Sequence, residues 1–291
     1  MDFNSNVGLD SSQVTSAGGG GGRGGGIALG GGLGLIITIL GLLFGFNPSQ
    51  ILGSGDATTT TSQTQQTNEC NNTADIQTNR ECRWTAYVNS IQSYWNTQFQ
   101  QGVYKPAQTI TFSGQVNTAC GTATSEVGPF YCPGDQKVYV DTGFVNQLLQ
   151  QLGAKGGNAA EAYIVAHEYG HHIQNLTGVM KQAQSSDETG PTSPQVRLEL
   201  QADCYAGVWF KNATQDQSGI ITNVTQDDLN RVIDAARAVG DDRIQEASSG
   251  RVQPESWTHG SAKMRQHWAG VGFQSGNPAS CDTFNTNDLG Q

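Results

Sequence analysis

The sequence predicts an α+β protein, and three observations lead to this class. Segments 104–116 and 136–141 alternate apolar and polar side chains, which is typical of strands with one buried face. The segments that follow carry apolar residues at three- and four-residue spacing, which is typical of amphipathic helices. Short strands that precede a run of helices are characteristic of the α+β class. No internal repeat interrupts this order.

The first 68 residues are predicted to lie outside the folded unit. Residues 1–26 are polar and glycine-rich, cannot bury enough apolar surface to fold, and are expected to be disordered. Residues 27–46 are uncharged and mostly apolar, which predicts a transmembrane helix because about twenty such residues span a bilayer. A cleaved signal peptide is the alternative, but the stretch is long for one and no clear small-x-small cleavage site follows it. Residues 47–68 are expected to form a flexible linker.

The position of one arginine predicts the membrane orientation. Arg23 is the only basic residue before Arg80, and it precedes the apolar stretch. Because basic residues favour the cytoplasmic side, we expect a cytoplasmic N-terminus and a single membrane crossing. Residues 69–291 would then form one extracytoplasmic domain.

Local signals place the helices of this domain. Segment 80–101 carries four large apolar residues at three- and four-residue spacing and is predicted to be an amphipathic helix. Another helix is expected at 144–152. The Ser-Pro pair at 193–194 is a typical helix start, with a capping hydroxyl before a first-turn proline. Thr and Asp at the ends of segment 225–228 predict a further helix start.

Residues 162–177 (AYIVAHEYGHHIQNLT) carry the clearest chemical signal. In a helix, His167 and His171 share one face and can direct two imidazoles at one zinc ion. Glu168 is one position further on, where its carboxylate can accept a proton from a water molecule activated by the metal. The neighbouring apolar residues indicate a half-buried helix, and surface histidines on a core helix are the alternative interpretation.

Flanking residues predict the limits of this helix. Asn158 and Glu161 have the spacing of a capping box, and two glycines precede them. Gly178 is a typical stop.

A catalytic zinc site needs a third protein ligand and leaves its fourth position to water. A third histidine in the pattern HExxHxxGxxH is absent, since Gln174 and Thr177 occupy the positions of its Gly and His. In the next predicted helix, Glu199 and Asp203 are four residues apart and share a face. We expect Glu199 to be the ligand and Asp203 to accept a hydrogen bond from the other nitrogen of a ligand histidine. The reverse assignment stays open.

The chain has six cysteines, all beyond the predicted membrane segment: Cys70, Cys82, Cys120, Cys132, Cys204 and Cys281. An even number is typical of an oxidising compartment, which agrees with an extracytoplasmic domain. Six cysteines allow fifteen pairings. The most economical set pairs Cys70 with Cys82, Cys120 with Cys132, and Cys204 with Cys281. A cysteine ligand to zinc is the alternative, but Cys204 follows Asp203 and points about 100° away from it.

The net charge is −10, from 15 basic and 25 acidic residues. This balance excludes nucleic acid and anionic membrane surfaces as expected partners.

Four blocks together resemble the neutral zinc metallopeptidase family. They are GPFYCPGDQKVYVDTGF, AYIVAHEYGHHIQ, RLELQADCYAGVWF and THGSAKMR, and the match runs in order from about residue 70 to residue 285. The block ELQAD also resembles the ExxxD motif of gluzincins, in which Glu binds zinc and Asp supports a histidine. The resemblance implies membrane anchoring, mostly in bacteria, and a zincin-like fold with a small sheet packed on the zinc helix. It also implies an edge strand that binds extended peptide, and 128–132 and 138–141 are the candidates.

The remaining histidines and one tyrosine receive different interpretations. His259 and Arg265 lie in THGSAKMR, and His259 is expected to help stabilise an oxyanion, with a polar capping role as the alternative. Tyr169 is expected to serve packing. His172 and His267 are expected to be surface or hydrogen-bonded structural residues.

The sequence therefore predicts a membrane-anchored peptidase that uses Zn²⁺ and a glutamate base to hydrolyse peptide or protein substrates. The expected site consists of His167, His171, Glu199, Glu168 and His259, and the oligomeric state is left open. Two alternatives remain: a zinc hydrolase of a non-peptide amide, and a non-catalytic, membrane-tethered binding module with structural zinc.

Overall fold

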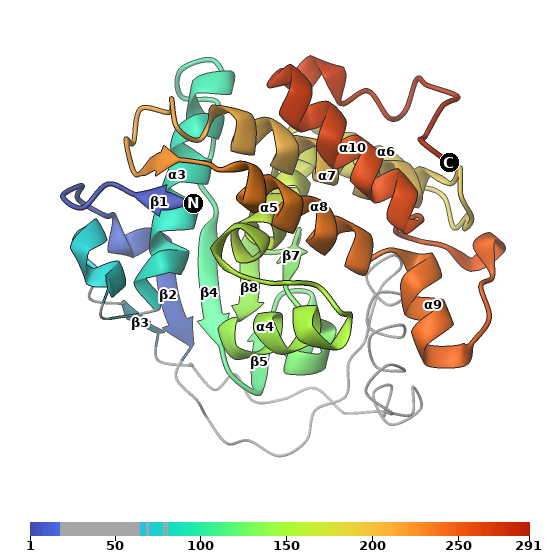
Figure 1. The fold of residues 1–291 in the computed structure, drawn as a ribbon, viewed down its shortest axis with the longest axis horizontal. Helices are drawn as coiled ribbons and strands as arrows, with labels where there is room; N and C mark the ends of the chain where they lie inside the picture. Colours follow the sequence, from blue (N-terminus) through green and yellow to red (C-terminus); the bar gives the residue numbers. More distant parts are fainter. Residues whose placement is uncertain (18–64, 68–69, 78, 80) are drawn as a thin grey trace.

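A computed structural model describes residues 1–17, 65–67, 70–77, 79 and 81–291 (Figure 1). Its main sheet has five strands in the order β3–β2–β4–β8–β7. The inner three strands are parallel, and the outer two are antiparallel to their neighbours. These strands are β2 (Val14–Ala17), β3 (Gln65–Thr67), β4 (Gln108–Phe112), β7 (Phe130–Cys132) and β8 (Lys137–Asp141).

Two smaller sheets complete the described strands. They pair β1 (Asp2–Phe3) with β9 (Ile221–Asn223), and β5 (Gln115–Thr118) with β6 (Gly121–Thr124). The described helices are α3 (Glu81–Gln98), α4 (Thr142–Gln151), α5 (Asn158–Thr177), α6 (Val179–Ala183), α7 (Pro194–Asn212), α8 (Gln226–Ala238), α9 (Asp241–Ser249) and α10 (Ala262–Ser275). This mixture confirms the α+β class.

Helix α5 is the centre of the fold. It contacts α3, α7 and α8 as well as strands β7 and β8, so the sheet packs on the motif helix as expected. Figure 1 shows α7 and α10 together at one end of the molecule, with the sheet toward the other. Every residue of α5 from Ala159 to Gln174 is buried. The expectation of a half-buried helix is therefore wrong, because packing surrounds α5 on all sides.

The N-terminal segment belongs to the folded unit, which corrects the expectation that residues 1–26 are disordered. Strand β2 pairs with both β3 and β4, and Val14 is fully buried. Strand β2 has only four residues, with no alternation of buried and exposed side chains, and a glycine run follows it, so the sequence carries no clear strand signal. Residues 65–67 also correct the predicted linker, since they form a strand.

This pairing overturns the predicted membrane orientation. Strand β2 precedes the apolar stretch in the sequence and β4 follows it, yet the two strands are hydrogen-bonded neighbours. Residues 1–17 and the domain must therefore share one compartment, and the N-terminus cannot be cytoplasmic if the domain is extracytoplasmic. Residues 27–46 and most of the predicted linker lie outside the described residues. No helix in the described part of the chain is long and apolar enough to span a membrane.

Most of the predicted helix ends are confirmed. Ser193 accepts a hydrogen bond from the N–H of Val196, and segment 225–228 forms a capping box. Gly178 ends α5 in the left-handed conformation. The predicted capping box of α5 is wrong, because its N-cap is Gly157 and makes no side-chain hydrogen bond. Glu161 instead lies beside Arg83 and accepts from the Tyr87 hydroxyl.

All three predicted disulfides are confirmed: Cys70–Cys82, Cys120–Cys132 and Cys204–Cys281. Since all six cysteines are paired, none is available as a metal ligand. The last disulfide attaches the C-terminal segment to α7. Two further contacts secure this segment, from Gln201 Nε2 to the Cys281 carbonyl at 2.9 Å and from the Thr283 hydroxyl to the Arg197 carbonyl at 2.7 Å.

Strand β7 is the edge strand of the two candidates. Among the described strands it pairs only with β8, whereas β8 lies between β4 and β7. All three residues of β7 are buried, and β7 contacts α5 directly.

Candidate metal centre

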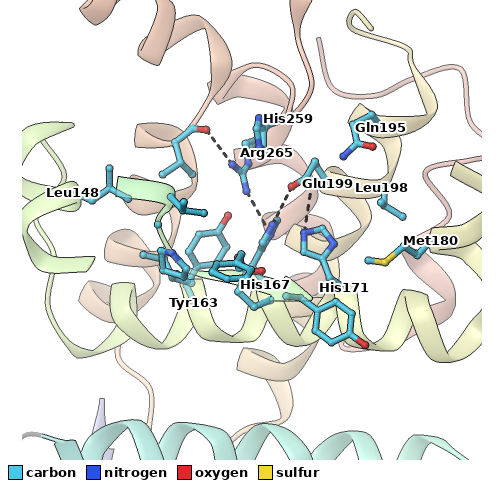
Figure 2. Close-up of a pocket in the computed structure, with 18 of the residues that line it drawn as sticks. Leu148, Tyr163, His167, His171, Met180, Gln195, Leu198, Glu199, His259 and Arg265 are labelled. Atoms are coloured by element: carbon cyan, nitrogen blue, oxygen red, sulfur yellow. Dashed lines mark hydrogen bonds and ion pairs between the residues drawn. The ribbon is translucent and has the colours of Figure 1, made fainter. Parts of the chain in front are cut away.

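Two helices bring three metal-binding side chains together. Helix α5 supplies His167 and His171, and α7 supplies Glu199. One nitrogen or oxygen atom from each of these residues lies within 4.8 Å of the other two. The Nε2 atoms of His167 and His171 lie 3.1 and 3.6 Å from the Glu199 carboxylate oxygens. Figure 2 shows both imidazoles directed at Glu199.

The second ring nitrogen of each histidine is held by a side chain. His167 Nδ1 lies 2.8 Å from Asp203 Oδ1, and His171 Nδ1 lies 2.9 Å from Gln174 Oε1. Both acceptors are oxygens, so each Nδ1 carries a proton, and in the neutral imidazole that binds a metal ion each Nε2 presents the lone pair. Gln174 also donates to the Leu198 carbonyl at 2.7 Å, which fixes its amide orientation.

Asp203 is a fully enclosed charge of the site. Its fully buried carboxylate accepts two hydrogen bonds of 2.8 Å from Arg265 and a hydrogen bond from the Tyr163 hydroxyl. Burial alone would raise the pKa of Asp203, but Arg265 and His167 lower it to about 2. Burial likewise lowers the pKa of His167, but Asp203 and Glu199 raise it to about 10. Asp203 thus stays ionised and holds the His167 ring.

Glu168 lines the same cavity as the three candidate ligands. Its side chain is buried, and burial raises the pKa of its carboxyl group above the usual range, although His171 and His167 partly oppose this shift. A glutamate with a raised pKa is a stronger base than a solvated one, which suits proton transfer near neutral pH.

His259 reaches the cavity from the loop before α10. Its Nδ1 lies 3.0 Å from Asp241 Oδ1, and Asp241 also accepts from the backbone N–H groups of Thr258, His259 and Gly260. Burial lowers the pKa of His259, but Asp241 outweighs it and the net shift is upward. The alternative of a helix cap is wrong, because Ser261 caps α10.

Tyr169, His172 and His267, which the sequence analysis also considered, lie outside the candidate metal site. The Tyr169 hydroxyl contacts Thr109 at 3.0 Å and the Ala107 carbonyl at 3.2 Å. Buried His172 bridges the Tyr131 hydroxyl and the Lys105 carbonyl, at 3.1 and 2.7 Å. These contacts confirm the predicted packing and hydrogen-bonded roles. His267 is exposed, as expected.

Sequence reasoning missed three residues of the site: Gln174, Asp241 and Tyr163. Gln174 was noted only as a departure from a three-histidine pattern. Its position three residues after His171 places both on one helix face, and this spacing is the signal that could have found it. Tyr163 lies four residues before His167 on the same helix face, so spacing could have found it as well. Asp241 reaches its histidine partner through the tertiary fold, and no local spacing indicates that contact.

The donor atoms of His167, His171 and Glu199 are of the types that bind zinc. Two imidazole Nε2 atoms and one carboxylate form a His₂Glu set, with both Nδ1 protons already engaged elsewhere. Ligands at about 2.0–2.2 Å from a tetrahedral zinc lie roughly 3.3–3.6 Å from each other. The measured separations of 3.1 and 3.6 Å between the histidine nitrogens and Glu199 are close to this range.

The fold and site define an α+β protein with a buried histidine–glutamate set for a metal ion. A family model described as "Putative neutral zinc metallopeptidase" matches residues 4–284. The chain therefore belongs to the neutral zinc metallopeptidase family. The match includes most of the N-terminal segment that pairs in the main sheet.

Curated relatives occur in several bacteria. "Uncharacterized protein Rv2575" of Mycobacterium tuberculosis H37Rv is 48% identical over 227 residues, which cover 76% of this chain and 76% of the relative. "Uncharacterized protein YpfJ" of Escherichia coli K12 is 36% identical over 284 residues, which cover 94% of this chain and 93% of the relative. No solved structure matches the chain.

Proposed function

We propose that this protein is a zinc-dependent peptidase with a zincin-like active site. One observation carries the proposal: His167, His171 and Glu199 converge at one point of a cavity that Glu168 also lines. A structural zinc site is normally closed by four protein ligands, whereas the described residues bring three together here. The third protein ligand is Glu199, and Asp203 acts by orienting His167.

In the proposed mechanism three residues bind the metal ion and Glu168 transfers the proton. His167, His171 and Glu199 would hold the zinc ion, which would supply a Lewis acid to polarise a carbonyl group and lower the pKa of a water molecule. Glu168 accepts the proton of the attacking water and returns it to the leaving amine. His259, held by Asp241, donates a hydrogen bond to the oxyanion that develops on the scissile carbonyl.

The replacement Glu168→Gln tests the mechanism. It removes the base and retains the size of the side chain, so we expect peptide hydrolysis to fall by at least about 10²–10⁴-fold. Zinc content, measured by elemental analysis of the full chain, should stay at the unmodified level. Near-normal hydrolysis by this variant would contradict the assignment of Glu168. The exposed Glu188→Gln variant is the matched control and should hydrolyse normally.

A second pair of variants tests the ligand assignment. Glu199→Ala should lose zinc more completely than Asp203→Ala, because the first removes a ligand and the second removes a support of one ligand. The opposite order would exchange the roles of the two acids. These measurements need the full chain, because a fragment that begins after the apolar stretch lacks strand β2.

Membrane attachment through residues 27–46 stays part of the proposal. Its support is the uncharged, mostly apolar composition of this stretch. Because β2 before the stretch pairs with β4 after it, the proposed attachment leaves both flanks on one side and is not a single crossing. The six paired cysteines support an oxidising compartment for the domain. Residues 14–17 then lie on that side as well, since they belong to the same sheet.

A further inference from the structure

Apart from its polar centre, the cavity has mostly apolar walls, whose polar members are Gln184 and Gln195. Its wall residues come from the β7 region, from α4 to α7, and from the ends of α8 and α9. The apolar members are Val127, Pro129, Phe130, Pro133, Leu148, Ile164, Met180, Leu198, Val239 and Ile244. The walls beyond the centre therefore favour an apolar ligand group.

The charged residues that line the cavity all belong to its polar centre. Arg265 is bound to Asp203 through two hydrogen bonds of 2.8 Å, and Glu199 faces the two ligand histidines. Glu168 stands beside those histidines in the sequence and in the cavity. A charged substrate side chain seated against the walls away from this centre would therefore lose its water without gaining a partner of opposite charge, which is costly.

One apolar wall stands directly beside the candidate metal ligands. Figure 2 shows Met180 and Leu198 on the His171 side of the site, whereas Leu148 lies on the opposite side, beyond Tyr163. Met180 belongs to α6, and Leu198 precedes Glu199 on α7. The Leu198 carbonyl accepts from Gln174, so this wall is fixed to the same contacts that orient His171.

The strand edge supplies a place for the backbone of a ligand. Strand β7 is an edge strand among the described residues, and residues 127–131 line the cavity. Tyr131 holds β7 to α5 through hydrogen bonds with His172 and Asn175, at 3.1 and 2.9 Å. An edge fixed in this way can pair with an extended peptide.

We propose that the cavity selects an extended peptide with a large aliphatic or aromatic side chain next to the scissile bond, seated against Met180 and Leu198. This inference rests on the proposed peptidase function and names its substrate class. Apolar pockets distinguish side chains that differ by one methylene by roughly 10–200-fold. Leucine and phenylalanine should thus exceed alanine clearly, and aspartate and lysine should be disfavoured.

Binding of peptide hydroxamates tests this specificity without requiring turnover. A dipeptide hydroxamate series on the zinc-loaded full chain would vary one side chain beside the hydroxamate: Leu, Phe, Ala, Asp or Lys. Calorimetry should give at least about 10-fold tighter binding for Leu than for Ala, and weaker binding for Asp and Lys. Equal affinities, a preference for a charged side chain, or no binding by the whole series would overturn the proposal.

A parallel peptide-cleavage assay tests the peptidase function separately from the apolar pocket. Selective binding of the Leu hydroxamate with no peptide cleavage would sink the peptidase function and leave the apolar pocket standing. Cleavage with no apolar preference would support the peptidase function and overturn the pocket assignment.

The replacement Met180→Lys locates the preference. An ammonium group in this wall should reduce the Leu-over-Asp preference by at least about 10-fold, because it offers the aspartate side chain a partner. Lys181→Met, at the exposed neighbouring position, alters the charge without altering the wall and should keep the original preference. If Met180→Lys does not fold, Met180→Ala should lower the Leu-over-Ala preference. Unchanged selectivity in a folded Met180 variant would overturn the assignment.

Discussion

Each candidate ligand histidine is fixed by a different neighbour on its second ring nitrogen. Asp203 holds His167 with a carboxylate, and Gln174 holds His171 with an amide. The carboxylate is itself fixed by Arg265 and the amide by the Leu198 carbonyl. Because such outer partners orient the ring and set its tautomer, they influence metal affinity without touching the metal.

Replacing Gln174 by Leu should weaken zinc binding. The change removes the acceptor for His171 Nδ1 and the donor to the Leu198 carbonyl, so the ring loses its fixed orientation. We expect the zinc dissociation constant to rise about 10–100-fold, measured by competition with a chelator. The exposed Gln182→Leu variant is the control and should bind zinc normally. Unchanged affinity in a folded Gln174→Leu variant would exclude this role.

The Asp241–His259 pair should make stability depend on pH. Asp241 has a pKa below its usual 3.8, so its contribution is present above pH 3.8 and is lost as pH falls through the lowered value. His259 has a pKa above its usual 6.5, so its contribution is full below pH 6.5 and is lost as pH rises through the raised value. The pair therefore stabilises the fold most between these limits.

Asp241→Asn should accordingly reduce the unfolding free energy most between about pH 4 and 6, by about 3 kcal/mol, because it leaves a buried charge without its partner. The difference from the unmodified protein should shrink at higher pH. Denaturant titrations across this range measure it, with the exposed Asp187→Asn variant as control. A difference that stays constant with pH would show that the pair is not ionised.

Some residue roles could be predicted from sequence and others could not. His167, Glu168 and His171 share one helix, and Glu199 and Asp203 share another, so fixed helical spacing reveals each group. Asp241 and His259 are 18 residues apart in two separate elements. Only the packing of α9 beside the loop before α10 brings this pair together.

At the scale of elements, close helix crossings position the ligands. Helices α5 and α7 meet where Gly170 lies against Ala202, three residues after Glu199. A Cβ atom on Gly170 would lie 2.9 Å from the Ala202 Cα atom. Helices α7 and α10 approach even more closely, since a Cβ atom on Gly207 would lie 2.2 Å from the Ala269 carbonyl oxygen. The first crossing carries Glu199 to the histidines, and the second carries Arg265 to Asp203.

Gly170→Ala should separate α5 from α7. The added methyl group has no room against Ala202, so the unfolding free energy should fall by about 1–3 kcal/mol and zinc affinity should fall with it. Gly270→Ala is the matched control, because no atom lies within 4 Å of its added Cβ and alanine favours helices by about 1 kcal/mol. Thermal and chelator titrations measure both effects. Equal behaviour of the two variants would show that the crossing tolerates wider spacing.

The element boundaries were predictable where local chemistry decides them. The starts of α7 and α8 follow from capping side chains, and the end of α5 follows from Gly178. The start of α5 was not predictable, because Glu161 binds Arg83 and Tyr87 of a distant helix instead of its own backbone. Tertiary contacts outweighed the local pattern there.

At the scale of the whole molecule, the sheet unites segments on both sides of the apolar stretch. Strand β2 lies between β3 and β4, and it contributes fully buried Val14 to the core. Parallel pairing between β2 and β4 joins residues about 95 positions apart, as in the pair Thr15 and Ile110. No local pattern predicts such a pairing, which explains why the sequence indicated a disordered N-terminus.

Labelling of intact cells tests this arrangement. Ser5→Cys and Ser248→Cys would each place one thiol on an exposed site, and the six native cysteines are all paired. A membrane-impermeant maleimide should label both variants or neither, because one sheet joins both regions. Labelling of only one variant would show that the membrane separates them and that β2 does not pair as described.

The Cys204–Cys281 disulfide can form only after the C-terminal segment has been synthesised. Helix α7, which carries Glu199, Asp203 and Cys204, is synthesised before Cys281. Cys281 follows Cys204 by 77 residues, and the disulfide cannot form until it is present. Helix α10, with Arg265, also arrives in that interval. The candidate ligands are therefore synthesised before the disulfide that restrains α7 can form, because Cys281 lies in the C-terminal segment. A chain still being synthesised is therefore expected to hold the candidate ligand set without this covalent restraint.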